Sequence, residues 1–326
     1  MKSILIRTLG GQDIGYGHYY RCISLAKAIL YLNKNIDIIF LINNGLINQI
    51  KKTDFKYIVE DNLEKDYQII KKFKVDLVIF DSYLGNNEYL KRIKKQSRLM
   101  LIDDNNDIYD SSLPDILYNG NIHAKKLNYN IVKSQLVFLG AEYLIMREEY
   151  WNNMLHNYAD KNGILITTGG TDKYGIALKI LYEIKDLKDN IRVIIGPSYK
   201  DTYIKEIENV KNENIELIYK PDSLKEYLSH SKIAITAGGT TVYEVLASKS
   251  IPVIFSIADN QDLICKELKS MGVQYLGKYP EIEYFRLKDI IRKLKYKELD
   301  IDKNIFEIIN KKGAILVAKK IIDYIG

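Results

Sequence analysis

The chain has 326 residues, of which 47% are hydrophobic and 28% charged, a balance typical of globular proteins that excludes wholesale disorder. The formal net charge of +6 comes from lysines scattered among acidic residues, and the densest basic segment, residues 292–297, fits the solvated face of a helix, so we expect no nucleic-acid partner. The two cysteines lie far apart without zinc spacing, and no apolar run approaches the roughly 20 residues of a membrane span, so we expect a soluble cytoplasmic protein.

Short apolar runs alternate with amphipathic segments along the first part of the chain. We expect strands at residues 3–7, 36–42, 57–59, 76–80 and 98–103. Between the first two runs, Cys22, Leu25, Ala26, Ile29 and Leu30 follow the spacing of one helical face. Strands that are apolar on both faces and separated by helices predict a parallel sheet covered on two sides.

The pattern becomes irregular between residues 104 and 161 and then restarts. We expect further strands at residues 163–168, 191–196, 215–219, 232–239, 251–257 and 273–277. Two successive series of this kind predict two doubly wound, Rossmann-like α/β domains facing a cleft. We expect an N-terminal domain at residues 1–150 and a C-terminal domain at 151–326, with a hinge near 148–162.

Glycine clusters follow three of these strands. They are Gly15 with Gly17, Gly169 with Gly170, and Gly238 with Gly239. Ligands of open parallel sheets bind beyond the carboxyl ends of strands, and glycine lets backbone amides and a helix N-terminus approach an anion. A tight turn would explain any single pair, but three pairs at equivalent positions favour a nucleotide diphosphate. The P-loop pattern and the third glycine of the dinucleotide fingerprint are missing, which disfavours a kinase or a nicotinamide enzyme.

A histidine stands directly behind the first cluster, in the stretch "QDIGYGHYYRC" (12–22). A neutral histidine has a pKa close to physiological pH and can act as a general base, the role we assign to His18 in preference to a capping or structural one. Arg21 could pair with a phosphate or with Asp81, or it could stay in a structural ion pair. The remaining histidines lack a comparable context and are expected to be structural or exposed; they are His123, His156 and His230.

Four more polar residues lie near predicted strand ends. Tyr83 could donate a hydrogen bond to substrate or water, or it could be an ordinary half-buried tyrosine. Asn260 and Gln261 could bind acetamido or phosphate oxygens, although Asn260 also fits a helix N-cap. Glu244 could accept hydrogen bonds from a ribose or could form a capping box with Thr241, and the sequence leaves these two interpretations about level.

Several segments, in the same order, resemble the nucleotide-sugar hydrolases of pseudaminic acid biosynthesis. They are "IGYGHYYRCISLAKAI" (14–29), "VIFDSY" (78–83), "LIDD" (101–104), "FLGAEYLIMREEY" (138–150), "TTGGTD" (167–172), "AITAGGTTVYEVLASKSIPVIF" (234–255) and "IADNQ" (257–261). That family removes UDP from a 2,4-diacetamido-2,4,6-trideoxy-β-L-altropyranose. It includes spore-coat polysaccharide proteins and resembles the two-domain glycosyltransferases of the B type, among them the peptidoglycan N-acetylglucosaminyltransferase. The run "GGTDKYG" (169–175) departs from the family pattern.

The resemblance implies that the C-terminal domain binds UDP, with Gly238, Gly239 and Thr240 facing the diphosphate and Glu244 the ribose. It also implies that His18 reaches the sugar from the N-terminal domain and that Gly15 and Gly17 give the ligand room. Tyr83 and Asn260 match positions near the sugar. The further substrate-binding residues that we expect are Arg21, Gly169, Gly170, Thr171 and Gln261.

The reaction that this arrangement implies is hydrolysis of a UDP-sugar, with His18 as the base, attack of water at the anomeric carbon, and inversion. Backbone amides and a helix dipole could hold the departing diphosphate, so no metal or other cofactor is expected, and "DDNND" (103–107) is expected to form a polar turn. The main alternative is a metal-independent glycosyltransferase, in which His18 deprotonates an acceptor hydroxyl. A non-catalytic nucleotide-sugar binding protein would need neither His18 nor Tyr83.

Overall fold

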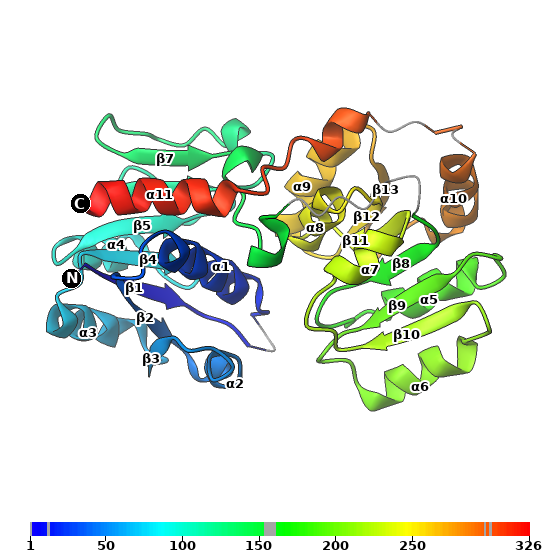
Figure 1. Ribbon diagram of the computed structural model, residues 1–326, viewed down its shortest axis with the longest axis horizontal. Coiled ribbons are helices and arrows are strands. Elements are labelled where there is room, and N and C mark those ends of the chain that lie inside the picture. Colours follow the sequence, from blue (N-terminus) through cyan, green and yellow to red (C-terminus); the bar gives the residue numbers. More distant parts are fainter. Residues whose placement is uncertain (1, 12–13, 153–160, 297, 300–301) are drawn as a thin grey trace. The chain divides into compact units, whose positions relative to one another are not determined.

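The computed structural model describes residues 2–11, 14–152, 161–296, 298–299 and 302–326. The chain divides into two compact units, Met1–Asn152 together with Asn310–Gly326, and Asn153–Ile309 (Figure 1). Each unit contains its own sheet, and every strand pair in both sheets is parallel.

The first unit has a seven-stranded sheet in the order β3-β2-β1-β4-β5-β6-β7. Its strands are β1 (Ser3–Thr8), β2 (Asp37–Ile42), β3 (Lys56–Val59), β4 (Leu77–Asp81), β5 (Arg98–Ile102), β6 (Ile116–Asn119) and β7 (Leu136–Leu139). Its α-helices are α1 (Gly17–Leu32), α2 (Ile47–Ile50), α3 (Asp66–Phe73), α4 (Asn87–Lys94) and α11 (Gly313–Ile325).

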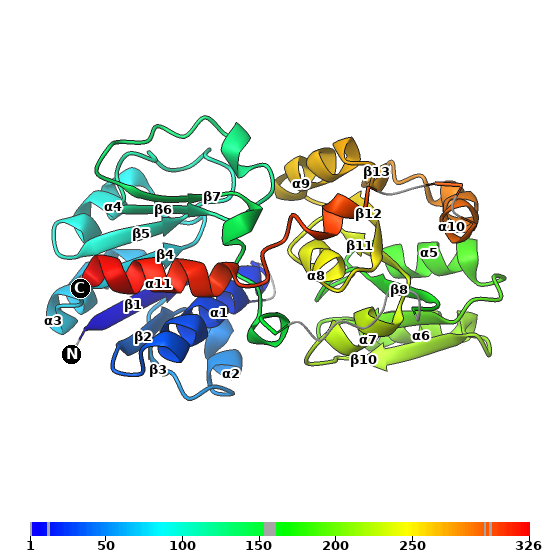
Figure 2. The same ribbon diagram turned by 45° about the horizontal axis from the view of Figure 1, so that its top comes forward.

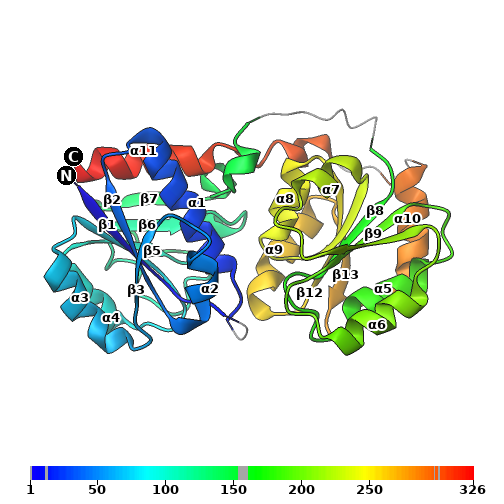
Figure 3. The same cartoon turned by 60° about the horizontal axis from the view of Figure 1, so that its bottom comes forward.

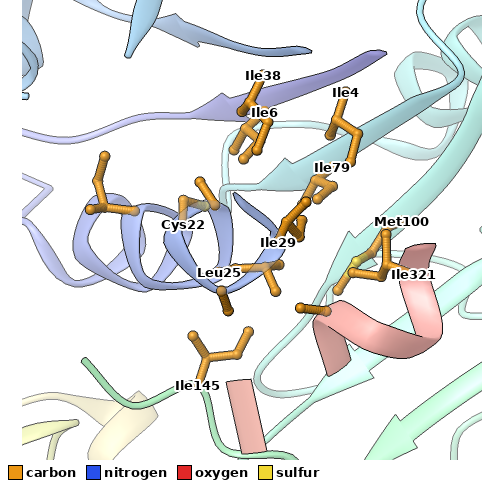
Figure 4. Close-up of a cluster of buried hydrophobic side chains, with 14 of the residues drawn as sticks. Ile4, Ile6, Cys22, Leu25, Ile29, Ile38, Ile79, Met100, Ile145 and Ile321 are labelled. Atoms are coloured by element: carbon orange, nitrogen blue, oxygen red, sulfur yellow. The ribbon is translucent and has the colours of Figure 1, made fainter. Parts of the chain in front are cut away.

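Alternate side chains of the central strands enter two separate cores of this unit. Ile4 and Ile6 of β1 pack with α1 and α11, whereas Leu5 packs on the other face with α3 and α4. On the α1 face, Figure 4 shows Cys22 and Ile29 among the side chains of the strands. A strand that is buried on both faces has an unbroken apolar run, and this explains why the sequence marked these strands clearly.

The second unit has a six-stranded sheet in the order β10-β9-β8-β11-β12-β13. Its strands are β8 (Ile164–Thr167), β9 (Ile191–Ile195), β10 (Ile215–Tyr219), β11 (Ile233–Ala237), β12 (Ile251–Ser256) and β13 (Gln274–Lys278). Its α-helices are α5 (Ile176–Ile184), α6 (Asp201–Val210), α7 (Lys225–His230), α8 (Thr241–Ala247), α9 (Asp259–Ser270) and α10 (Leu287–Lys295). Helices α7 and α8 cover one face of this sheet, and α5 and α6 lie on the opposite face (Figure 3).

The structure confirms two doubly wound α/β domains, and each strand expected from the sequence forms. Two additional strands, β6 and β7, lie in the segment whose pattern is irregular. No α-helix separates β5, β6 and β7 in the fully described segment 103–135, where a short 3-10 turn at Ala124–Lys126 is the only helical element. The alternation of strand and helix that revealed the other strands is therefore missing there.

The division of the chain differs from the expected one at its C-terminal end. Residues 310–326 belong to the first unit, because α11 packs on α1 (Figure 2). Its residues Ala314, Val317, Ile321 and Ile325 lie in the core of that unit. Helices α1 and α11 are almost 300 residues apart in sequence, so no local sequence pattern predicts their contact. The expected hinge near residues 148–162 falls largely on residues 153–160, outside the described part of the chain, as does His156. Among the described residues, no helix combines the length and the apolar character needed to cross a membrane.

Each sheet has a point where the strand order reverses, between β1 and β4 in the first unit and between β8 and β11 in the second. Connections leave such neighbouring strands toward opposite faces, which opens a crevice at their carboxyl ends. The three glycine clusters follow β1, β8 and β11, so all of them lie at these two crevices.

Candidate active site

The loop after β1 places His18 at the start of α1. Gly11 and Gly15 exchange two backbone hydrogen bonds, with N···O distances of 3.1 and 2.8 Å, and Gly15 has a φ of +85°, which a residue with a side chain rarely adopts. Helix α1 begins at Gly17, where an added Cβ would meet no atom within 4 Å. Gly15 thus shapes the loop, and Gly17 borders open space beside His18.

His18 is bound to a fully buried carboxylate. Its Nδ1 lies 2.6 Å from Asp81 Oδ1, and the two side chains are 11% and 0% exposed. Burial raises the pKa of Asp81, but Arg21 and His18 outweigh burial and hold this pKa below its usual value. Asp81 is therefore ionised and accepts the Nδ1 proton, and His18 Nε2 has no hydrogen-bond partner among the described residues.

Arg21 lies between two carboxylates. Its Nε and Nη2 donate to Asp81 at 3.0 and 2.8 Å, and its Nη1 and Nη2 donate to Asp104 at 2.7 and 3.1 Å. Burial lowers the pKa of Arg21, but the two carboxylates raise it well above its usual value. Of the alternatives that the sequence left open, the structure contains the pairing with Asp81, and each guanidinium nitrogen already has an acceptor.

Asp104 collects further donors from two more loops. Its Oδ2 accepts from Tyr83 Oη at 2.6 Å, and its Oδ1 accepts from Asn121 Nδ2 at 2.8 Å. Burial raises the pKa of Asp104, yet Arg21, His18 and Tyr83 together lower it far below its usual value. We call this set of side chains the carboxylate network; its members are His18, Arg21, Asp81, Tyr83, Asp104 and Asn121.

The direction of the Tyr83 hydroxyl differs from what the sequence suggested. Burial and the neighbouring charge of Asp104 raise the pKa of Tyr83, so the hydroxyl keeps its proton. Since ionised Asp104 cannot donate, that proton points to Asp104 and not to substrate. The rings of Tyr83 and His18 meet edge to face, with centroids 4.6 Å apart, so the hydroxyl-bearing ring is a direct neighbour of the base.

Several members of the network were not selected from the sequence. Asp81 ends β4 and Asp104 follows β5, so a search for acids at the carboxyl ends of strands would have found both. Asn121 follows β6, a strand that the pattern missed. The buried His123 lies nearby, with Nε2 3.2 Å from the carbonyl oxygen of Asp104.

The polar turn expected at residues 103–107 forms. Asp103 Oδ1 accepts hydrogen bonds from the amides of Asn105 and Asn106 at 2.9 and 2.6 Å. Across the described parts of the chain, no group of three or more His, Cys, Asp or Glu side chains is arranged to hold a metal ion. The positive charge between the two carboxylates of the network is that of Arg21.

In the second unit, the glycine pair after β11 leads directly into α8. The Gly238 amide donates to the Phe255 carbonyl at 2.8 Å, and a Cβ at this position would lie 2.1 Å from Cys265 Sγ, so packing requires Gly238. A Cβ on Gly239 would meet nothing closer than Gln261 Nε2 at 3.8 Å. The amides of residues 239–241 have no backbone acceptor among the described residues, as expected at a helix start.

Helix α8 starts one residue earlier than a capping box would require. Thr240 is the cap residue and its side chain makes no capping hydrogen bond, so Glu244 is the fourth residue of the helix and not the third. Glu244 is half-buried. The structure thus weakens the capping explanation for Glu244.

The glycine pair after β8 has a different setting. Gly169, with a φ of +96°, Gly170 and Thr171 are exposed, and the chain then reaches Asp172. Asp172 accepts from the amides of Ile176 and Ala177 at 2.8 and 2.7 Å. The first amides of α5 are therefore occupied by an internal carboxylate.

The two polar residues after β12 lie in the first turn of α9. Ala258 is the cap residue, so the alternative of an N-cap at Asn260 is wrong, and the Asn260 side chain is exposed. Gln261 Oε1 accepts from the Ile257 amide at 3.0 Å, while its Nε2 lies near Gly239. Gln261 therefore borders the start of α8.

Comparison with known proteins gives relatives and a fold. No family model matches the chain. An uncharacterized protein of Methanocaldococcus jannaschii is 29% identical over 98% of this chain and 68% of its own length. A UDP-2,4-diacetamido-2,4,6-trideoxy-β-L-altropyranose hydrolase of Campylobacter jejuni is 25% identical over 85% of this chain and 100% of its own length.

Among solved structures, MurG of Acinetobacter baumannii matches with a TM-score of 0.67 at 14% identity, over 99% of this chain and 100% of its own. The chain has the two-domain fold of the B-type glycosyltransferases. The expected fold is confirmed.

Proposed function

We propose that this protein is an enzyme that acts on a UDP-sugar, and specifically that it hydrolyses a UDP-linked 2,4-diacetamido-2,4,6-trideoxy sugar to UDP and free sugar in the biosynthesis of a pseudaminic-type acid. The observation that carries the proposal is the base at the carboxyl edge of the first sheet: His18 Nδ1 is bound to Asp81 and its Nε2 is unengaged. The Campylobacter jejuni relative, named as a hydrolase of such a nucleotide sugar, supports the choice of substrate.

In the proposed reaction, a water oxygen attacks the anomeric carbon while the bond from this carbon to the diphosphate oxygen breaks. The electron pair of that bond leaves with UDP, and His18 Nε2 takes a proton from the water. Asp81 stabilises the imidazolium that forms, since its carboxylate lies 2.6 Å from Nδ1. A single displacement of this kind inverts the anomeric centre, and UDP leaves without a metal or another cofactor.

The proposed site for UDP is the start of α8. The amides of residues 239–241, without a backbone acceptor of their own, would hold the diphosphate, and Glu244 would accept the ribose hydroxyls. Asn260 and Gln261, in the first turn of α9, would contact the sugar or the phosphates. We assign a lesser role to Gly169, Gly170 and Thr171, because Asp172 takes up the first amides of the helix that follows them.

The test of the reaction is an incubation with UDP-2,4-diacetamido-2,4,6-trideoxy-β-L-altropyranose in oxygen-18 water without an acceptor. We expect UDP and free sugar, with the label on the sugar. Label on UDP would disprove attack at carbon. UDP binding without turnover would favour the alternative, a metal-independent glycosyltransferase. The variant His18→Ala should lose turnover by about 10²- to 10⁴-fold while its affinity for UDP stays nearly unchanged.

A matched pair of glycine variants tests the nucleotide site. Gly239→Ala and Gly170→Ala each add a Cβ whose nearest neighbour is at least 3.8 Å away, so neither should destabilise the fold. If the diphosphate approaches the start of α8, Gly239→Ala should weaken UDP binding by about tenfold or more, and Gly170→Ala should leave it nearly unchanged. Isothermal titration calorimetry measures both. A larger loss for Gly170→Ala would move the diphosphate to the loop after β8.

A further inference from the structure

The Tyr83 hydroxyl has only acceptor capacity left for a ligand. Its proton is held by Asp104 Oδ2 at 2.6 Å. Asp104 cannot return a proton, because two Arg21 nitrogens and Asn121 Nδ2 also donate to it and keep it ionised. A tyrosine oxygen that donates its proton in this way offers its lone pairs to any other group that comes near.

His18 offers an acceptor of the same kind. Its Nδ1 proton is held by Asp81, so in the neutral imidazole, the form that acts as the base in the proposed reaction, Nε2 accepts a hydrogen bond. The rings of His18 and Tyr83 are in edge-to-face contact, and both are anchored through Arg21, which binds Asp81 and Asp104 together. The network therefore presents one acceptor on each of two rings that are in contact, while the Nδ1 proton of His18 and the hydroxyl proton of Tyr83 are held by Asp81 and Asp104.

We infer that Tyr83 and His18 together hold the nucleophile by accepting two protons from it, and that this pair of acceptors selects water over an alcohol. The inference rests on the proposed hydrolase function. Water has two O–H groups and satisfies both acceptors, whereas a sugar hydroxyl or methanol has one O–H and leaves one acceptor unpaired. An unpaired acceptor in a desolvated site disfavours the alcohol by about tenfold or more.

The protons and electrons of the step balance. The water oxygen forms its bond to the anomeric carbon as the bond to the diphosphate oxygen breaks and UDP takes the electron pair. One water proton passes to His18 Nε2 and later to solvent. The other proton stays on the oxygen, which becomes the free hydroxyl of the sugar and still donates to Tyr83.

The experiment is a competition between water and methanol, with Tyr83→Phe as the test variant. Tyr83→Phe removes one acceptor but leaves Asp104 its three other donors, so the base and its carboxylate stay in place. The control is Tyr89→Phe, which removes a hydroxyl that donates to Asp66 Oδ2 at 2.7 Å, outside the carboxylate network. The readout is the ratio of methyl glycoside to free sugar, measured by NMR at early times and a fixed methanol concentration.

We expect wild-type protein and Tyr89→Phe to form free sugar and very little methyl glycoside. Tyr83→Phe should lower kcat by about 3- to 30-fold with little change in KM, and it should raise the ratio of methyl glycoside to free sugar by about tenfold. A merely structural role of Tyr83 would lower activity without changing this ratio.

Three outcomes would count against the inference, and they are distinguishable. An unchanged product ratio in Tyr83→Phe overturns the role of Tyr83 and leaves the hydrolase intact. A wild-type product ratio equal to the molar ratio of methanol to water overturns the selection of water without the use of any variant. Absence of UDP release from wild-type protein in water overturns the proposed function itself, and the inference with it.

Discussion

The first unit contains two arginine–aspartate–tyrosine clusters that have opposite electrostatic character. In the first, Arg7 Nε and Tyr89 Oη each donate to Asp66 Oδ2 at 2.7 Å, and all three side chains are buried. Both Nη atoms of Arg7, and Asp66 Oδ1, have no partner among the described residues. The second cluster is the carboxylate network, in which Arg21 alone contributes four hydrogen bonds to two carboxylates.

The pKa values of Asp66 and Asp104 differ accordingly between the two clusters. Burial raises the pKa of Asp66 to about 6, despite the charge of Arg7 and the hydrogen bond from Tyr89. The pKa of Asp104 moves in the other direction, because Arg21, Tyr83 and other donors outweigh burial. A neighbouring arginine alone therefore does not determine whether a buried acid is ionised. The number of hydrogen-bond donors that reach the oxygens of the carboxylate determines it.

The largest expected effect is on stability, from removing each arginine. Arg21→Met leaves two ionised carboxylates without their shared cation and should lower the free energy of unfolding by about 3–5 kcal/mol. Arg7→Met should lower it less, by about 1–2 kcal/mol, because Asp66 takes up a proton readily. Urea unfolding at pH 7 measures both variants. An equal or larger loss for Arg7→Met would contradict the comparison.

The next effect is a loss of stability between about pH 4 and about pH 7, which the Asp66 cluster should cause and the carboxylate network should not. The folded-state pKa of Asp66 is about 6 and the ordinary value is 3.8, so the folded protein binds this proton more tightly than the unfolded chain. The resulting stabilisation is complete below about pH 4 and is lost as the pH rises through about 6, a change of about 2–3 kcal/mol. Asp81 and Asp104 have lowered pKa values and lose their contribution only in more acidic solution.

Asp66→Asn cannot titrate and should therefore remove this decline. Urea unfolding of wild-type protein and Asp66→Asn at about pH 3.5 and about pH 7, on either side of this window, measures it. The difference in unfolding free energy between the two proteins should shift in favour of the variant as the pH rises. A constant difference would show that Asp66 is ionised throughout this range.

The smallest effect concerns the two tyrosine hydroxyls. Tyr89→Phe leaves Asp66 with a single donor, Arg7 Nε, and should lower the free energy of unfolding by about 1–2 kcal/mol. Tyr83→Phe leaves Asp104 three donors and should lower it by less than about 1 kcal/mol. Thermal unfolding at neutral pH compares them. A larger loss for Tyr83→Phe than for Tyr89→Phe would show that the number of other donors does not determine how much each hydrogen bond contributes to stability.

Local pattern accounts for most of the fold. The central strands, such as β1 and β4, are buried on both faces, and their apolar runs are visible in the sequence. Strands β6 and β7 were not predicted because loops, and not α-helices, connect them. The packing of α11 on the first unit was not predicted because it depends on tertiary contacts between segments that are distant in sequence.

Single residues of the candidate site could be predicted from the sequence, but the hydrogen bonds that connect them could not. His18 could be selected because a histidine behind two glycines is distinctive. The direction of the Tyr83 proton could not be selected, since it depends on the ionisation of Asp104, and that in turn depends on Arg21 and Asn121 in other loops. Parallel strands bring these loops together only in the folded sheet.

The return of α11 to the first unit has a consequence for the order of folding during synthesis. The second unit, Asn153–Ile309, is continuous in sequence and can fold as soon as it leaves the ribosome. The first unit lacks part of its core until Ala314–Ile325 have been made, because α11 contributes its apolar face there. The first unit can thus complete its core only after the whole of the second unit has been synthesised, and until then the surface of α1 that α11 covers lacks this cover.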